Sequence, residues 1–443
     1  MKENRRKFLK ISGVSALGLL STDPRQLATY AQAKLTPSID KTLNEKIKGA
    51  YDLALNILKP TRKQLERGLE LHRNAVVFDA YGFMPRSAVD GASLAAAAIE
   101  HASPMEFSDI HEDMSMTHFV DNERERQELA TAWEASGVTC VFQNAGEEGS
   151  SIELLLKRLA RFTWTTDRIP DIVGKAVTPD DIVKAKLDNR RVLYFTGNGV
   201  PLPQEWRSAE EELRYIRIFF QLGVRMMHLT YNRRNVIGDG CAESANGGLS
   251  DFGRQVVKEL NRVGVIPDVA HSGWQTSLEA ALISEKPVVA SHTTVASINK
   301  HIRSKPDNVI KAIADKDGYI GICCIPRFLG GTGDITAMLK HIDYVVKKFG
   351  SDYVGIGTDV AYTSTFAEEE QRKVPRQSPG RTRWEALWPK EDFVESAEMR
   401  QSMAWTNWPL FTVGLVQLGY SDEDIQKIIG KNVLRVARAT FPG

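Results

Sequence analysis

Eight short apolar runs, most of them rich in valine and isoleucine, alternate along this chain with stretches of helical periodicity. The expected strands are 75–79, 138–142, 192–196, 225–230, 265–270, 287–291, 319–324 and 353–358. The expected helices between them include 208–222, 251–263, 274–284, 307–315 and 334–349. Such alternation is typical of parallel strands joined by right-handed crossovers. Eight such units, with no GxGxxG motif after a strand, predict a (β/α)8 TIM barrel rather than an open doubly wound sheet.

Four segments lie outside this repeat. Residues 34–73 have a helical, polar pattern and predict an N-terminal helical extension. Residues 83–121 and 363–391 follow strand ends and are expected to be long loops on the catalytic face of the barrel. Residues 422–439 predict an amphipathic C-terminal helix that packs on the barrel exterior.

The N-terminus has the features of an export signal. Arg5 and Arg6 resemble the twin-arginine motif, and Ala31-Gln32-Ala33 resembles a cleavage site. We therefore expect residues 1–33 to be a signal peptide and residues 34–443 to be a single barrel domain, periplasmic or otherwise exported. No later segment is apolar for the roughly 18 residues of a membrane span, so none is expected in the mature chain.

Composition narrows the class of protein. Of the 443 residues, 42% are hydrophobic and 26% are charged, which is ordinary for a globular protein and unlike a disordered one. Lys+Arg (57) and Asp+Glu (56) balance to a net charge of +1, so nothing indicates a nucleic-acid partner. Four cysteines are too few for a disulfide-built scaffold.

In a TIM barrel the reactive residues stand at the carboxyl ends of the strands. His271 and His292 end two successive expected strands, where two imidazoles can converge on one metal ion; zinc suits them well. Asp359 ends the last strand, where a carboxylate can move a proton or ligate a metal. Arg303 follows His292 and can form a bidentate contact with a substrate carboxylate. The alternative for each is a purely structural role.

Six short motifs occur in order along the second half of the chain: QLGVR (221–225), LTYN (229–232), GLSDFG (248–253), DVAH (268–271), ASH (290–292) and GIGTD (355–359). Together they resemble the membrane dipeptidase (renal dipeptidase) family. The match is dense from about residue 190 to 440, including a final helical segment around 429–436, and weaker from 74 to 190.

This resemblance implies an amidohydrolase-type barrel with two zinc ions that cleaves dipeptides. It assigns His271 and His292 to one zinc, Asp359 to the catalytic face and Arg303 to the substrate carboxylate. A homodimer is also an expectation from the family.

The chain departs from the family pattern at three places. Tyr81 and Phe83 stand where the family has a His-x-Asp pair of zinc ligands. Thr196 or Asn198 stands in place of its bridging glutamate, and Tyr231 in place of its substrate-facing histidine. Because three of five zinc ligands are missing, we expect one zinc or other divalent ion per chain. Tyr231 remains a candidate substrate-binding residue.

Other residues could supply replacement ligands. Asp79 ends the first expected strand, and Cys241 and Glu243 follow the strand at 225–230. The segment with His111, Glu112, Asp113 and His118 is a further source, although a solvated charged loop is the better explanation of it.

Three functions stay open at this level. The first is an exported metal-dependent hydrolase of a dipeptide or similar small amide, a small-molecule substrate that bears a carboxylate. The second is a tailoring enzyme of another reaction class on the same barrel. The third is a non-catalytic dipeptidase-like binding protein.

Overall fold

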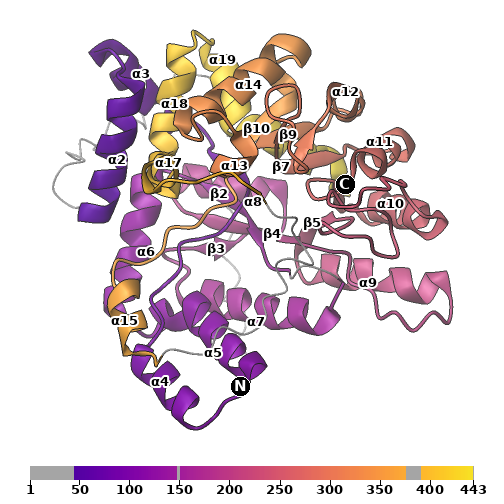
Figure 1. Ribbon diagram of the computed structural model, residues 1–443, viewed down its shortest axis with the longest axis horizontal. Helices are drawn as coiled ribbons and strands as arrows, with labels where there is room; N and C mark the ends of the chain where they lie inside the picture. The colour runs from indigo at the N-terminus through magenta and orange to yellow at the C-terminus, as the bar shows by residue number, and fades with distance from the viewer. Residues whose placement is uncertain (1–43, 147–149, 376–390, 443) are drawn as a thin grey trace, which may run out of the picture. The chain divides into compact units, whose positions relative to one another are not determined.

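Parallel strands form the centre of the structure, a computed structural model that describes residues 44–146, 150–375 and 391–442. Eight strands follow one another around the barrel (Figure 1). They are β1 (Phe78–Gly82), β2 (Cys140–Asn144), β4 (Val192–Gly197), β5 (Val224–His228), β6 (Ile266–Asp268), β7 (Val289–Val295), β9 (Tyr319–Ile322) and β10 (Val354–Ile356). Two short strands, β3 (Gly174–Lys175) and β8 (Ser304–Lys305), pair with β4 and β7. This architecture confirms the predicted TIM barrel.

Hydrogen bonds beyond the last strand bring β10 back to β1. The Asp359 N–H donates to the Tyr81 carbonyl oxygen at 3.1 Å. The Thr358 N–H donates to Oδ1 of Asp79 at 2.9 Å. The ring of strands is thereby nearly closed, and the residues that close it stand at the carboxyl ends of the strands.

Local signals set the helices that connect the strands. α10 (Asp251–Val263) begins where Ser250 accepts the N–H of Gly253 and ends at Gly264, whose φ of 95° suits glycine. α9 (Ala209–Gln221) and α14 (Ile335–Phe349) begin at the caps Ser208 and Asp334. The other connecting and flanking helices are α2 (Glu45–Leu58), α3 (Arg62–Asn74), α6 (Glu123–Ser136), α7 (Ile152–Arg168), α8 (Pro179–Leu187), α11 (Trp274–Ile283), α12 (Asp307–Ala314), α13 (Pro326–Leu329), α17 (Ala397–Ser402) and α18 (Trp408–Gln417).

The expectation of a long loop at 83–121 is wrong, because this segment is largely helical. It contains α4 (Gly91–Ile99), α5 (Pro104–Thr117) and the 3-10 turn η1 (His118–Val120). Ser103 and Glu106 form a reciprocal capping box at the start of α5, which fixes a helix that lacks a clear apolar stripe. In the second expected loop, α15 (Ala367–Lys373) is described, and residues 376–390 lie outside the described residues.

The C-terminal helix also differs from the expectation. It is divided into α19 (Asp422–Gln426), a π-helical turn (Lys427–Lys431) and α20 (Asn432–Thr440). Gly430 lies against β1 so closely that a Cβ there would stand 2.1 Å from the Val76 carbonyl oxygen. The apolar side of α20 packs with the first residues of the strands, such as Phe78 and Tyr319, rather than on the barrel exterior. The helix therefore covers the amino-terminal end of the barrel, and this leaves the carboxyl ends for the site.

Residues from Leu43 onward form one compact unit. Within the described ranges, no helix is both long and apolar enough to cross a bilayer. The expected signal peptide, residues 1–33, lies outside the described residues.

Candidate active site

Three buried histidines meet at the carboxyl ends of β5, β6 and β7. His228 is the last residue of β5, His271 follows β6, and His292 lies within β7. Nε2 of His271 is 2.9 Å from Nε2 of His292. Nε2 of His228 is 2.7 Å from Oδ2 of Asp268, the last residue of β6. Ligand atoms of His228, Asp268 and His292 all lie within 4.8 Å of one another.

Neighbouring side chains orient the two facing imidazoles. Nδ1 of His271 is 2.7 Å from Oδ1 of Asn232, and an amide oxygen can only accept, so Nδ1 donates and Nε2 keeps its lone pair. Nδ1 of His292 is 2.9 Å from the Ser291 hydroxyl, which can donate or accept. Burial, followed by the charge of Arg303, holds the pKa of both histidines well below the usual value. Neutral rings with inward-facing Nε2 atoms are suited to bind a metal ion.

The buried carboxylate of Asp268 supports this group from β6. Its Oδ1 accepts the N–H groups of Ala270 and Ser291 at 2.9 and 3.1 Å. Burial alone would raise its pKa, but the charge of His228 and the hydrogen bonds keep the pKa below the usual value. Asp268 is therefore ionised and can either orient His228 or bind a cation.

Two tyrosine rings cover the facing histidines. Tyr81 stacks on His292 with ring centroids 3.8 Å apart, and Tyr231 stacks on His271 at 4.2 Å. The Tyr81 hydroxyl donates to Oδ1 of Asn198 at 2.6 Å. Burial holds the pKa of Tyr81 well above the usual value, so the phenol stays protonated. Tyr81 stands where the resemblance expects one zinc ligand, and it bonds Asn198, which follows β4 and is one of the two residues, with Thr196, at the position of another.

Asp359 stands at the end of β10 in a left-handed backbone conformation with φ of 56°. This conformation is uncommon for a residue with a side chain, and aspartate tolerates it better than most. Burial raises the pKa of its carboxyl to about 6, against the opposing charges of Arg303, His228, Arg327 and Arg86. A carboxyl of this kind changes protonation state close to neutral pH.

Arg303 is fully buried beside the histidines. Its Nη2 donates to the His292 carbonyl oxygen at 2.9 Å, and its Nε donates to the Ala270 carbonyl oxygen at 3.3 Å. The guanidinium also lies over the ring of Phe328 at 5.1 Å. Arg303 therefore ties the loop after β7 to the ends of β6 and β7 and places positive charge there.

The replacement metal ligands expected from the sequence, Asp79, Cys241 and Glu243, bond to other residues. Both oxygens of Asp79 accept hydrogen bonds, Oδ1 from the N–H of Thr358 and Oδ2 from the Thr358 hydroxyl (2.6 Å) and the Trp405 indole (3.2 Å). Sγ of Cys241 is 3.3 Å from Oδ1 of Asn232, next to His271. Oε1 of Glu243 accepts the backbone N–H of Arg234 at 3.1 Å within its own turn. Of these three, Cys241 lies nearest to the histidine group through a shared partner.

The sequence reasoning missed His228 and the role of Asp268. His228 was included within the expected strand 225–230, where it counted as an ordinary strand residue. The alternation of side chains along a strand could have identified His228. Met226 packs inside the barrel, and His228, two residues later, lies on the same face of the strand.

Comparison with known proteins gives a family match for this chain. The family model for membrane dipeptidase (peptidase family M19) matches residues 66–376. Dipeptidase tcpJ of Claviceps purpurea is 28% identical over 228 residues, which are 50% of this chain and 46% of that protein. The chain thus matches about half the length of this curated relative.

Solved structures show the same fold. An amidohydrolase from Pseudomonas aeruginosa has a TM-score of 0.62 and 26% identity, and the match covers 84% of this chain and 99% of that one. The probable dipeptidase PvdM from the same organism has a TM-score of 0.60 and 18% identity, covering 86% and 98%.

Proposed function

Because the chain belongs to the membrane dipeptidase family, we propose that it hydrolyses a small amide of the dipeptide type with the help of one divalent metal ion, zinc or a similar ion. The observation that carries this proposal is the convergence of the Nε2 atoms of His271 and His292, 2.9 Å apart at the carboxyl ends of the strands. The alternative functions, a different reaction on the same barrel or ligand binding alone, are outcomes of the test below.

The residues present fit one ion. His271 and His292 are each held through Nδ1, so that both Nε2 atoms can face a shared ligand. His228 and Asp268 offer further ligand atoms within 4.8 Å of His292. An ion bound there would polarise the substrate carbonyl and make water a better nucleophile. A second ion does not fit, because Phe83 has no ligand atom and Tyr81 is a protonated phenol bonded to Asn198.

We assign proton transfer to Asp359. A carboxyl with a pKa of about 6 exists in both protonation states near neutral pH. It can take a proton from the attacking water and return it to the leaving amine.

Substrate binding is assigned to Arg303 and Tyr231. Arg303 places a positive charge beside the histidines, where it attracts a substrate carboxylate. Tyr231 lies flat against His271, and its ring holds the substrate next to that side chain.

We further propose that the protein is exported as a single-domain mature chain of residues 34–443. The support is the pair Arg5 and Arg6 with the small-residue segment 31–33. A periplasmic location follows if this signal is used.

Metal content and amide hydrolysis test the proposal together. Elemental analysis of gently purified protein should give about one divalent ion per chain, and a double variant His271→Gln, His292→Gln should bind less than about a tenth of that. His118→Gln is the matched control, because His118 is half-buried and bonds Ala88 and Asn122 elsewhere on the catalytic face. The metal-loaded protein should hydrolyse members of a panel of L,L and L,D dipeptides.

Two results would contradict the proposal. Two tightly bound ions would mean that other residues rebuild a second site. A metal-loaded protein that binds dipeptides without cleaving them would point to a binding protein or to another reaction class.

A further inference from the structure

A cavity of about 410 Å³ lies beside the histidine group, at the carboxyl ends of β1 and β2. Its walls come from the segment after β1, from α5 and α7, and from the segment that leads into α15. Phe83, Met84, Met116 and Phe162 give it an apolar side, and Arg86, His111, Glu112 and Arg158 give it a polar side. None of these residues belongs to the site described above apart from Phe83, which lies next to Tyr81.

Arg86 is the charged group that this cavity leaves without a counter-ion. Its backbone is fixed on both sides, since its N–H donates to the Tyr362 carbonyl oxygen at 2.8 Å and its carbonyl accepts the Ser364 N–H at 3.0 Å. The guanidinium lies over the Phe83 ring at 4.8 Å. Among the described residues it makes no hydrogen bond and no carboxylate lies within 4 Å of it. Arg86 is exposed to solvent at the cavity wall, and an arginine whose donors are unused there is suited to bind an anion.

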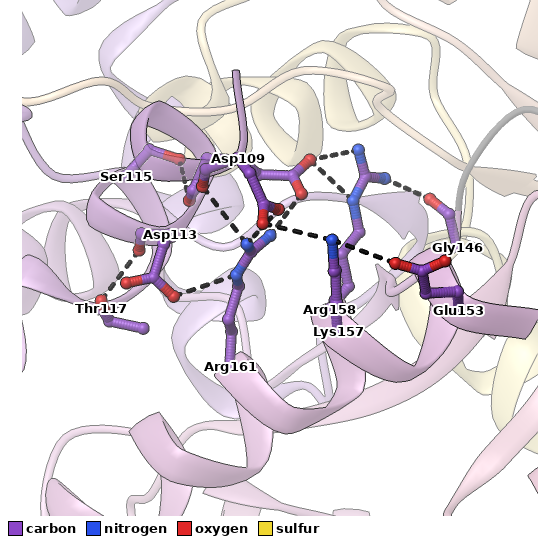
Figure 2. Close-up of polar contacts among 10 residues, drawn as sticks. Asp109, Asp113, Ser115, Thr117, Gly146, Glu153, Lys157, Arg158 and Arg161 are labelled. Atoms are coloured by element: carbon purple, nitrogen blue, oxygen red, sulfur yellow. Dashed lines mark hydrogen bonds and ion pairs between the residues drawn. The ribbon is translucent and has the colours of Figure 1, made fainter. Parts of the chain in front are cut away.

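The acidic residue on the opposite wall, Glu112, acts on Arg86 only through space, because its oxygens are bonded to other arginines. Glu112 is paired with two arginines of α7: Nε of Arg158 is 2.7 Å from its Oε1, and Arg161 contacts its Oε2. Figure 2 shows Arg158 and Arg161 side by side on α7, facing Asp109 and Asp113 of α5. Arg161 also bonds Asp109 at 2.6 Å and Asp113 at 3.0 Å, which holds α5 against α7. Burial and the charge of Arg86 lower the pKa of His111, so that side chain is neutral. Its polar atoms can therefore bond a ligand without adding charge.

Two aromatic rings lie between the cavity and the histidine group. Phe83, which carries Arg86 over its face, lies edge-on to Tyr81 with ring centroids 5.9 Å apart. Tyr81 in turn stacks on His292. The cavity therefore lies on the far side of the Tyr81 and Phe83 rings from the histidine group.

We propose that this cavity is a substrate-binding subsite for a carboxylate next to an apolar side chain, with Arg86 as the residue that binds the carboxylate. The inference rests on the proposed function in one respect, that the bound group is part of the substrate. Binding of the carboxylate itself is independent of metal and of turnover. The subsite makes the enzyme specific for amides that carry an acidic, partly apolar group on the side that faces β1 and β2.

The test uses a probe pair that differs only in charge, N-acetyl-L-phenylalanine and N-acetyl-L-phenylalaninamide. Titration calorimetry with the full chain should show at least about tenfold tighter binding of the acid than of the amide, as expected for a charge-assisted hydrogen bond. Arg86→Gln should reduce this preference to the part that Arg303 supplies, and Arg86→Lys should retain more of it because the charge remains. Arg168→Gln is the matched control, since Arg168 also lies over an aromatic ring, Trp164 at 5.0 Å, but outside the cavity.

The outcomes separate this inference from the proposed function. Equal binding of the two probes to the unaltered protein, no binding of either, or a preference for the acid that Arg86→Gln leaves unchanged would overturn the subsite. To exclude binding at the histidine group, the titration is repeated with the His271→Gln, His292→Gln double variant. If that variant keeps an Arg86-dependent preference while the unaltered protein hydrolyses no dipeptide, the subsite stands and the proposed function fails.

Discussion

Asp79 allows a direct test of whether a buried carboxyl of this barrel has a structural role or binds the metal ion. Its buried carboxyl joins β1 to the end of β10 and to Trp405. Burial raises its pKa from 3.8 to about 7, although the hydrogen bonds oppose the shift. Because the folded-state pKa is above the unfolded value, the native state binds this proton more tightly. The stability that the protonated form contributes is therefore lost as the pH rises from about 4 through 7.

The magnitude follows from the two pKa values. At about 1.4 kcal/mol for each pKa unit, the complete loss is about 4 kcal/mol, of which about 2.5 kcal/mol develops between pH 5 and pH 8. Asp79→Asn imitates the protonated carboxyl in size and charge, so this variant should lack the pH-dependent loss. It also leaves the Trp405 N–H facing an amide, at a cost of about 1–3 kcal/mol that is the same at both pH values.

Urea unfolding at pH 5 and pH 8, followed by circular dichroism, measures this directly. Between the two pH values, the free energy of unfolding of Asp79→Asn should gain about 2.5 kcal/mol relative to the unaltered protein. Asp334→Asn is the control: Asp334 caps α14 and its pKa is lowered, so its contribution is present at both pH values and its effect should not change. The variant should also keep its metal ion. A pH-independent effect of Asp79→Asn would refute the pKa argument, and loss of the ion would make Asp79 a ligand.

The remaining predictions concern activity and export. Asp359→Asn should lower kcat by about 10²–10⁴-fold and leave the metal content intact, and loss of the ion would instead make Asp359 a ligand. Because the pKa of Asp359 is about 6, kcat of the unaltered enzyme should change through pH 6, and this step should be absent in Asp359→Asn. Arg303→Lys should mainly raise KM for substrates that bear a carboxylate, and an unchanged KM would contradict its role as an anchor. Replacing Arg5 and Arg6 by lysine should leave the precursor in the cytoplasm, whereas normal export would refute the twin-arginine assignment.

The barrel could be predicted because strands buried on both faces must be apolar over most of their length. All eight expected strands correspond to observed ones, but their bounds shift. The first was expected at 75–79 and is found at Phe78–Gly82, because pairing with β2 and the closure to β10 decide where it begins and ends. The two helices between β1 and β2 could not be recognised in the same way. α4 and α5 have weak apolar stripes and are fixed by the caps Asp90 and Ser103.

The candidate site was predictable where a chemical residue type coincides with a strand end. His271, His292 and Asp359 were found by that rule, and the structure places all three on the carboxyl side of the barrel. His228 was missed, because it follows two methionines and the apolar run continues after it. The cavity at Arg86 could not have been predicted, since its walls combine the segment after β1, the end of β2, α5, α7 and the segment after β10, which only the fold brings together.

The three departures from the family pattern act as one set rather than as independent losses. Tyr81 places a phenol where the family has a histidine ligand. If the family's glutamate were kept as a metal ligand, the buried Tyr81 hydroxyl would have no hydrogen-bond partner, and this would lower the stability of the fold. Here the Tyr81 hydroxyl donates to Asn198, and its ring stacks on His292. Tyr231 covers His271 in the same manner. The two histidines thus have an aromatic ring on one face and a fixed Nδ1 partner, which leaves their Nε2 atoms as the shared reactive surface. If these residues depend on one another, Asn198→Glu alone should destabilise the protein and should not restore a second ion, because the Tyr81 phenol would still occupy the ligand position. Gain of a second ion in that variant would show that the pocket kept its binuclear geometry.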